Sequence, residues 1–520
     1  MGYFDWICGL KGFAVLVVGV SVFIGSQDFV VKDLVEPLLE QYLGYVKYLP
    51  LEGVEGIPAW AKIDTELQFH TVHFDDIKDI GLDEEVPTLI KHSPVADWEA
   101  LKLWNPTYVI EAQPKLTNAK FPVLKKSVLL YEDDSRLFRE WDDSLKAEYQ
   151  KEVDALKLEH TKEIDVQGMG TLTVSQLDTT KIPPFKGIGD KTVGTFNITA
   201  DEFFAMDVKA QWDTRLPSHF SDQVLPRNFM YVVDSENEPL ESDFQENIRI
   251  SKLGSTTGLH YDPSHNMFAQ IHGCKRFVLI ETKHWKKIKL HPFYHPSDRQ
   301  SQLELFDFKS GSYRKPLPAM VIDLRPGDLL HLPPYYFHRV TAMECENATV
   351  SMSVNVFSNS KAGRLSTAVK HTDNIPAYFV HPSSVEEKKQ KLLVGALGYY
   401  VRTLVHSLTN STMKEFVLKS IIQERYLTQD QLSEALECDG FNVTLCPSLM
   451  MNSEEFIKAD PSFAEQVKAD AEKKVETIKQ AELSPSIQEL VLADTIERVV
   501  TLVVSLERSC MFLQCLGNSI

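Results

Sequence analysis

Thr257-Gly-Leu-His-Tyr-Asp-Pro-Ser-His-Asn266 is the stretch that decides the fold, together with a distant histidine, His338. Within it, one residue separates His260 from Asp262, and side chains at positions i and i+2 of a β-strand point to the same face. His338 ends a second stretch, Arg325-Pro-Gly-Asp-Leu-Leu-His-Leu-Pro-Pro-Tyr-Tyr-Phe-His338, in which strand-like runs alternate with turns. These patterns predict two strands that bring two imidazoles and one carboxylate together.

Two histidines and one carboxylate on one face are the ligand set of non-haem Fe(II) oxygenases, which leaves further metal positions open. An isolated His-x-Asp step is often a surface coincidence, but here both neighbourhoods have strand and turn patterns. His331 precedes His338 in the same stretch and competes with it as the third ligand. The spacing alone leaves that choice open.

Length and composition set the broad class of the protein. With 520 residues, of which 43% are hydrophobic and 24% charged, the chain can bury a large core and should form two or three domains. The net charge of −19 argues against a nucleic acid partner, since phosphate binding needs a basic surface.

The N-terminus has the pattern of a secretory signal. Residues 12–25 form an uncharged apolar run, so we expect 1–26 to be a signal peptide or a signal anchor, with a membrane tether through 7–25 as the second option. Four Asn-x-Ser/Thr triplets agree with a location in the endoplasmic reticulum or Golgi lumen, or with secretion; they begin at Asn197, Asn347, Asn410 and Asn442.

The cysteines fit an oxidising compartment. Six remain beyond the signal-like segment, an even number. Cys438 and Cys446 are close enough in sequence to pair, as are Cys510 and Cys515. Cys274 and Cys345 we interpret as thiols of the core and of a loop.

Composition shifts along the chain predict three regions after the signal. Residues 27–225 should form an α/β region, with a charged helical insertion at about 133–200. Residues 226–360 alternate short apolar runs with Gly and Pro turns, as in an antiparallel jelly roll. Residues 361–520 should be α-helical, with helices at Glu386–Leu408, Lys414–Arg425, Glu454–Ala481 and Ser486–Leu506.

The stretch from Asn247 to Phe357 resembles the Jumonji-C class of cupin hydroxylases, and most closely its asparaginyl hydroxylase branch, which includes factor inhibiting hypoxia-inducible factor. The matching text is Asn266-Met-Phe-Ala-Gln-Ile-His-Gly-Cys-Lys-Arg276, His295-Pro-Ser-Asp-Arg-Gln-Ser-Gln302, Pro326-Gly-Asp with His338, and Val354-Asn355. The resemblance implies a mainly β core, a double-stranded β-helix with flanking helices. It also implies dependence on Fe(II), 2-oxoglutarate and O₂.

The resemblance assigns roles residue by residue. His260, Asp262 and His338 would hold the iron, which selects His338 over His331. The distal carboxylate of 2-oxoglutarate would be bound by a buried cation and two hydroxyls, those of Lys275, Thr257 and Tyr231. The amides of Asn266 and Asn355 would flank the co-substrate. A buried lysine is costly without an anion, which agrees with this role of Lys275.

The substrate is the open part of the resemblance. Arg299 and Gln300 match residues that contact a peptide, so we expect hydroxylation of a protein side chain. Phe357 stands where the family has a tryptophan, which puts the substrate in doubt. A catalytically silent scaffold and a hydroxylase of a small molecule or glycan are the alternatives. The C-terminal helices would suit a homodimer, as helices after the barrel do in the resembled enzyme.

Overall fold

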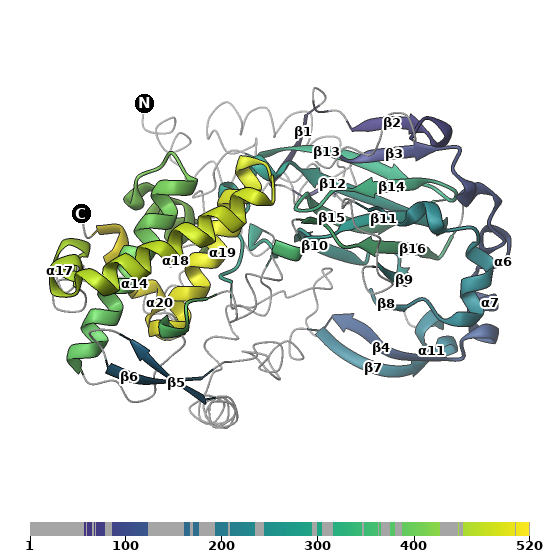
Figure 1. Cartoon of the computed structure of the whole chain (residues 1–520). Coiled ribbons are helices and arrows are strands. Elements are labelled where there is room, and N and C mark those ends of the chain that lie inside the picture. Colours follow the sequence, from purple (N-terminus) through teal and green to yellow (C-terminus); the bar gives the residue numbers. More distant parts are fainter. Residues whose placement is uncertain are drawn as a thin grey trace, which may run out of the picture. The chain divides into compact units, whose positions relative to one another are not determined.

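The computed structural model describes about three fifths of the chain, drawn as the coloured ribbon in Figure 1. The described residues are 57–58, 60–64, 67, 69–77, 86–122, 161–166, 170–175, 193–205, 209–233, 244–293, 299–303, 316–345, 348–361, 363–365, 375–379, 387–426, 446, 451–504 and 506–518. The chain divides into two compact units, Met1–Lys62 with Asp307–Pro316, and Ile63–Phe306 with Leu317–Ile520. The signal-like segment lies outside the described residues.

Two antiparallel sheets of the second unit form the predicted jelly roll, so the fold-class prediction is confirmed. One sheet has the order β13-β12-β15-β10: Leu317–Leu324, Cys274–Ile280, Phe337–Met343 and Thr256–His260. The other has the order β2-β3-β14-β11-β16-β9-β8-β4-β7: His70–His73, Thr88–Lys91, Leu329–Leu332, His265–His272, Val350–Ser358, Phe244–Lys252, Gln211–Arg215, Lys115–Pro122 and Val193–Thr199. Only the pair β2 and β3 is parallel among the strand pairs of these described segments.

Both faces of the larger sheet are buried, which explains the apolar run in β11. Phe268 points into the barrel and packs against Phe277 of the opposite sheet. Its neighbours Met267 and Ala269 point outward, into a second core. That core is covered by short helices: η4 (Pro94–Asp97), α6 (Ala100–Leu103), α7 (Pro106–Ala112), α11 (Ala200–Ala205), α12 (Ser218–Ser221), η5 (Asp222–Val224) and η6 (Asn228–Met230). A strand covered on both faces needs no polar alternation.

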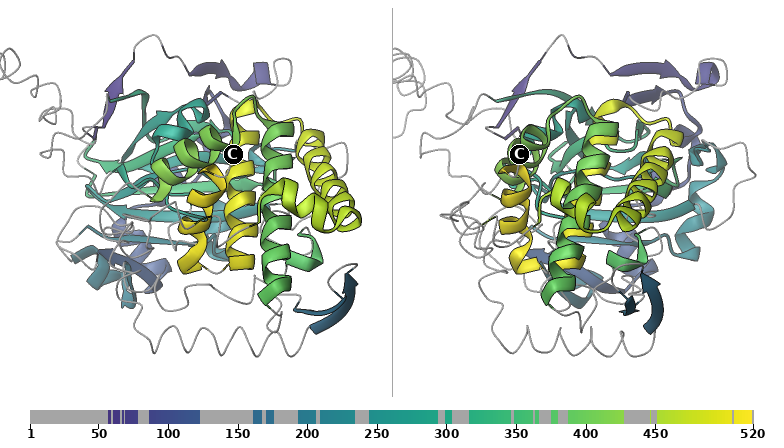
Figure 2. Two further views of the ribbon diagram at one scale, coloured as in Figure 1. Left: turned by 90° about the vertical axis from the view of Figure 1, so that its left-hand side faces the viewer. Right: turned by 60° about the vertical axis from the view of Figure 1, so that its left-hand side comes forward.

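The C-terminal region is helical, close to the predicted bounds. The helices are α14 (Glu387–Leu408), the π-helix η13 (Glu415–Tyr426), α17 (Ser453–Ala459), α18 (Pro461–Gln480), α19 (Pro485–Val504) and α20 (Leu506–Asn518). They pack side by side in both views of Figure 2. The single helix expected over 454–481 is two, because Pro461 starts a new helix and the Asp460 side chain caps it. The described part of the second unit also contains short 3₁₀ segments, η3 (Phe74–Asp76), η8 (Thr282–Lys287) and η12 (Ala377–Phe379).

The expected helical insertion is β in the parts that the structure describes. Thr161–Val166 (β5) and Gly170–Ser175 (β6) form an antiparallel pair, and β7 joins β4. Most of the amphipathic helix predicted from residue 133 lies outside the described residues. The strand β1 (Ala61–Ile63) lies at the boundary of the two units.

The disulfide predictions are wrong. Cys274 is bonded to Cys345 and Cys446 to Cys515, and Cys510 is disulfide-bonded as well. Cys510 and Cys515 both belong to α20, where residues five apart do not face each other. Cysteines near in sequence were therefore a poor guide to cysteines near in space.

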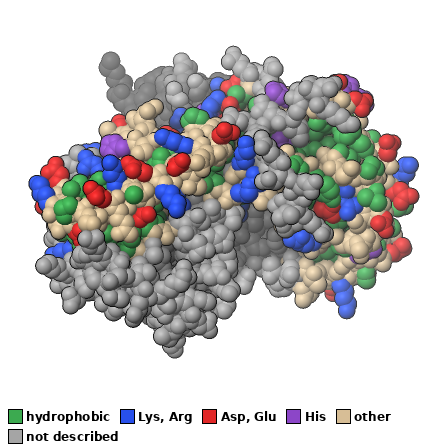
Figure 3. All heavy atoms as spheres, viewed as in Figure 1, with side chains coloured by type: hydrophobic (Ala, Val, Ile, Leu, Met, Phe, Trp, Pro, Cys, Tyr) green, Lys and Arg blue, Asp and Glu red, His purple; other side chains and the backbone are tan. Residues whose placement is uncertain are grey.

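Charge and hydropathy of the described surface add two observations. On the face shown in Figure 3, Lys and Arg are interspersed with Asp and Glu. Over the described ranges, no helix combines the length and the apolar character that a membrane crossing requires.

Candidate metal centre

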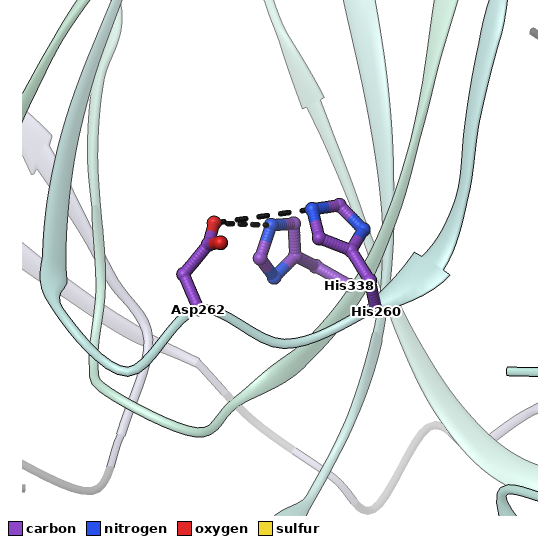
Figure 4. A group of neighbouring side chains, drawn as sticks. All are labelled: His260, Asp262 and His338. Atoms are coloured by element: carbon purple, nitrogen blue, oxygen red, sulfur yellow. Dashed lines mark ion pairs between the residues drawn. The ribbon is translucent and has the colours of Figure 1, made fainter. Parts of the chain in front are cut away.

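His260, Asp262 and His338 converge inside the mouth of the barrel. His260 is the last residue of β10 and pairs in register with His338 of β15, with ring centroids 4.2 Å apart. Asp262 Oδ2 lies 3.8 Å from His260 Nε2 and 3.6 Å from His338 Nε2 (Figure 4). All three ligand atoms lie within 4.8 Å of one another. The strand ends at His260, so Asp262 reaches this position from the following turn rather than from a shared strand face.

Hydrogen bonds orient both imidazoles. His260 Nδ1 lies 2.7 Å from the carbonyl oxygen of Gly258, and His338 Nδ1 lies 3.0 Å from that of Tyr336. Because a carbonyl can only accept, each Nδ1 carries the proton and donates it. The lone pair is then on Nε2, the atom that faces Asp262.

Burial keeps the two imidazoles neutral. It lowers the pKa of His260 to about 3, with a further contribution from His338, and it also lowers the pKa of His338. Burial by itself would raise the pKa of Asp262, but the cationic forms of the two imidazoles and the guanidinium of Arg299 favour the carboxylate, so the pKa of Asp262 is lowered overall. Two neutral nitrogen donors and one carboxylate fit a divalent transition metal.

His331 does not join this group. It lies in β14, fully buried, with Nε2 3.1 Å from Nδ1 of His265. Burial, and after it His265, lowers the pKa of His331 to about 3. Within the described ranges, the one cluster with metal-binding geometry contains His338 instead.

Lys275 is a buried cation in the barrel interior. Its side chain is 3% exposed, Nζ donates to Ser353 Oγ at 2.9 Å, and Nζ lies 5.0 Å from the centre of the Phe268 ring. Burial lowers the pKa of Lys275 well below its usual range, and Arg249 adds to that effect. No carboxylate among the described residues forms an ion pair with it. An anionic ligand would relieve the cost of burying this cation.

The other predicted interior residues lie in the strands around this lysine. Thr257 is buried in β10. Asn355 of β16 donates from Nδ2 to Asn266 Oδ1 of β11 at 3.1 Å. Asn355 Oδ1 is buried and accepts no hydrogen bond from the protein, so the amide pair keeps one free acceptor.

Tyr231 is not brought to this group. It packs against the outer core of the larger sheet, and its hydroxyl donates to Glu246, a carboxylate that also accepts from Arg227 Nε at 2.6 Å. The short sequence match around Tyr231 did not determine on which side of the sheet it lies. Its hydroxyl has a carboxylate partner there, away from Lys275.

Arg299 and Gln300 lie beside the triad. Arg299 Nη1 donates to Asp262 Oδ1 at 3.4 Å, and Gln300 forms an isolated β-bridge with His260. Sequence reasoning assigned both only to a substrate. The structure also places Arg299 against Asp262, a member of the candidate metal cluster.

Two interior residues escaped the sequence prediction. Arg249 occupies an inward position of β9, and the signal for it is an alternation, Asn247-Ile-Arg-Ile-Ser251, in which Arg249 shares a face with polar residues. Tyr261, between two metal-ligand candidates, donates its hydroxyl to Asp494 of α19 at 3.2 Å. No local pattern indicates that second contact.

Comparison with known proteins places the barrel among the cupins. A family model described as a cupin-like domain matches residues 82–363. Solved cupin structures, oxalate decarboxylases of Bacillus subtilis among them, match 29–30% of the chain at about 10% identity, and their TM-scores of 0.15–0.16 carry no argument.

Three curated relatives match part of the chain. A lysine-specific demethylase, JMJ30, of Arabidopsis thaliana is 29% identical over 144 residues, 27% of this chain and 30% of the relative. JmjC domain-containing protein D of Dictyostelium discoideum is 25% identical over 25% of this chain and 30% of its own. tRNA wybutosine-synthesizing protein 4 of Aspergillus oryzae is 29% identical over 187 residues, which are 32% of this chain and 16% of the relative. The match therefore spans less than a third of each of these relatives.

Proposed function

The chain belongs to the cupin-like domain family, and from that premise we propose that it is an Fe(II)- and 2-oxoglutarate-dependent dioxygenase that hydroxylates a protein side chain in the secretory pathway. One observation carries the proposal. A two-histidine, one-carboxylate cluster shares one barrel with a buried lysine that forms no ion pair with a carboxylate of the described residues. The relatives with JmjC domains support an oxygenase of this type.

Each residue group would have a distinct task. The metal would be held by Nε2 of His260, Nε2 of His338 and a carboxylate oxygen of Asp262. Lys275 would bind the distal carboxylate of 2-oxoglutarate, and the free amide acceptor of Asn355 would orient the ligand beside it. With O₂ and 2-oxoglutarate, the bound iron supplies oxidation of a substrate C–H bond, with release of succinate and CO₂. The buried barrel walls exclude water from that chemistry.

Two residues beside the triad support a protein substrate. Arg299 and Gln300 lie beside the triad, at the positions that contact a peptide in the resembled asparaginyl hydroxylase. The half-buried Phe357, in place of a tryptophan, changes the same region. A small-molecule or glycan substrate, and a silent scaffold, would each give a different result in the following test.

Purified protein with Fe(II) is expected to convert 2-oxoglutarate to succinate, and Lys275→Met is expected to raise the KM for 2-oxoglutarate by about 10-fold or more, because a charged hydrogen bond is lost. Succinate is measured by mass spectrometry in assays that contain either a peptide library or a set of glycans as candidate substrates. Lys283→Met is the matched control, since Lys283 is exposed and paired with Glu281. Succinate at the background level of Asp262→Ala would favour the scaffold.

The secretory location is supported by the disulfides and by acceptor exposure. Structural disulfides persist in oxidising compartments, and Asn410 of the triplet Asn410-Ser-Thr is exposed. Protein expressed from the full gene in animal cells is expected to lose mass on peptide-N-glycosidase treatment, and Asn410→Gln to lose one glycan. Alkylation under non-reducing conditions should leave Cys274 and Cys345 unmodified. Unglycosylated protein with free thiols would contradict this location.

A further inference from the structure

A second cation faces the interior of the barrel beside Lys275. Arg249 of β9 lies directly across from Ser353 of β16 in antiparallel register, and Ser353 is the hydrogen-bond acceptor of Lys275. On its other side, Arg249 is in register with Asp213 of β8. Residues in register across a sheet share one face, so Asp213, Arg249 and Ser353 form a polar row on the inner face.

Within the described residues, one donor of the Arg249 guanidinium has no partner. Its Nε is buried and has no hydrogen-bond partner, and no carboxylate of the described ranges forms an ion pair with it. Asp213 accepts instead from Gln211 Nε2 at 3.2 Å. A guanidinium offers planar, paired donors that suit a carboxylate.

The side chain of Arg249 leads from the lysine toward the metal ligands. Its guanidinium carbon lies 5.9 Å from the centre of the Phe357 ring, at the far end of β16 from Ser353. The next residue of that strand, Ser358, pairs with His265, which follows Asp262 closely in the chain. The positive charge of Arg249 lowers the pKa of Lys275.

We propose that Arg249 binds the carboxylate that lies next to the metal ligands, while Lys275 binds the distal carboxylate of the same oxo acid. The assignment rests on the proposed function and adds a second anion subsite to it.

Binding of two oxo acids to the Mn(II)-loaded full-length protein separates the two subsites. 2-Oxoglutarate has a distal carboxylate and 2-oxobutanoate has none, and calorimetry gives Kd for each. Arg249→Gln is expected to raise the Kd of both acids by similar factors, about 10- to 100-fold. Lys275→Met is expected to raise the Kd of 2-oxoglutarate and to leave the Kd of 2-oxobutanoate unchanged. Arg249→Lys should recover part of the loss, because it keeps the charge.

Arg276→Gln is the matched control. Arg276 follows Lys275 in the same strand but points outward to Asp323, with Nη2 2.7 Å from Oδ2, so both Kd values should stay unchanged. Mn(II) affinity and the melting curve of Arg249→Gln show whether the metal site and the fold persist.

Two outcomes would overturn the assignment of Arg249. Unchanged binding of both acids would mean a structural role, and weakening of 2-oxoglutarate alone would move Arg249 to the distal carboxylate. Wild-type protein that binds Mn(II) but neither acid would instead refute the proposed function, and the subsite with it. The wild-type and variant titrations thus distinguish the two failures.

Discussion

Asp262→Ala is expected to lower metal affinity by more than about 100-fold and to abolish succinate formation, since even residues that only support a metal ligand contribute roughly 10- to 100-fold. Asp262 is the single anionic member of the cluster. Without it, two neutral imidazoles would have to hold a divalent cation in a buried site, with no charge to offset it. Titration with Co(II), followed by its visible absorbance, measures the affinity without turnover.

His331→Gln is the control for this prediction. His331 is a buried barrel histidine that lies outside the cluster, so its loss should leave Co(II) affinity within about threefold, whatever it does to stability. Wild-type affinity in Asp262→Ala, or a large loss in His331→Gln, would mean that the ligand set is wrong.

Arg425→Met is expected to lower the free energy of unfolding by about 3–5 kcal/mol, because it leaves buried carboxylates without their cationic partner. Arg425 is 2% exposed on η13, and Nη1 donates to Asp494 Oδ1 at 2.8 Å and to Glu497 Oε2. Asp494 in turn accepts from Tyr261, the residue between His260 and Asp262. Denaturant unfolding measures the loss, and Co(II) affinity should fall with it.

Lys419→Met on the same helix is the matched control. Its ammonium group is exposed and lies 3.9 Å from Glu415, so we expect a change within about 0.5 kcal/mol. Similar losses in both variants would show that Arg425 does not stabilise a buried network.

The pH dependence of this network has a definite sign. Burial raises the pKa of Glu497 to about 6, although Arg425 opposes it, while Asp494 adds to the rise. Between the unfolded value of about 4.5 and 6, the folded state binds more protons, so this group's contribution to stability falls as pH rises. Without Arg425 the folded pKa rises further, so the loss in Arg425→Met should be larger at pH 7 than at pH 5.

The barrel and the cluster of His260, Asp262 and His338 were predictable from local signals, with the resemblance selecting His338 over His331. His260 and Asp262 are two residues apart, His338 follows a Pro-Pro turn, and the strands alternate with Gly and Pro turns. Lys275 was predictable through resemblance, since it follows the turn at Gly273 in a matched segment. Tyr231 failed because a short match does not reveal which face of a sheet a side chain meets.

The disulfides and Arg249 show what a linear pattern omits. Cys274 and Cys345 meet because β12 and β15 are neighbours in one sheet. The position of Arg249 near Lys275 follows from the register of β9 against β16, which places Arg249 across from Ser353, the hydrogen-bond acceptor of Lys275. Neither relation is visible in the spacing of residues along the chain.

By itself, the sequence predicted the fold class and the pairing of two histidines with a carboxylate, because strand alternation and short motifs are properties of neighbouring residues, while the resemblance supplied Lys275. Only the tertiary structure decided that Tyr231 lies outside the barrel, that Arg249 lies within it, and that Tyr261 is tied to Asp494. The physical reason is that sheet register and helix packing bring together residues that are distant in the chain. Many weak contacts together determine that register and packing.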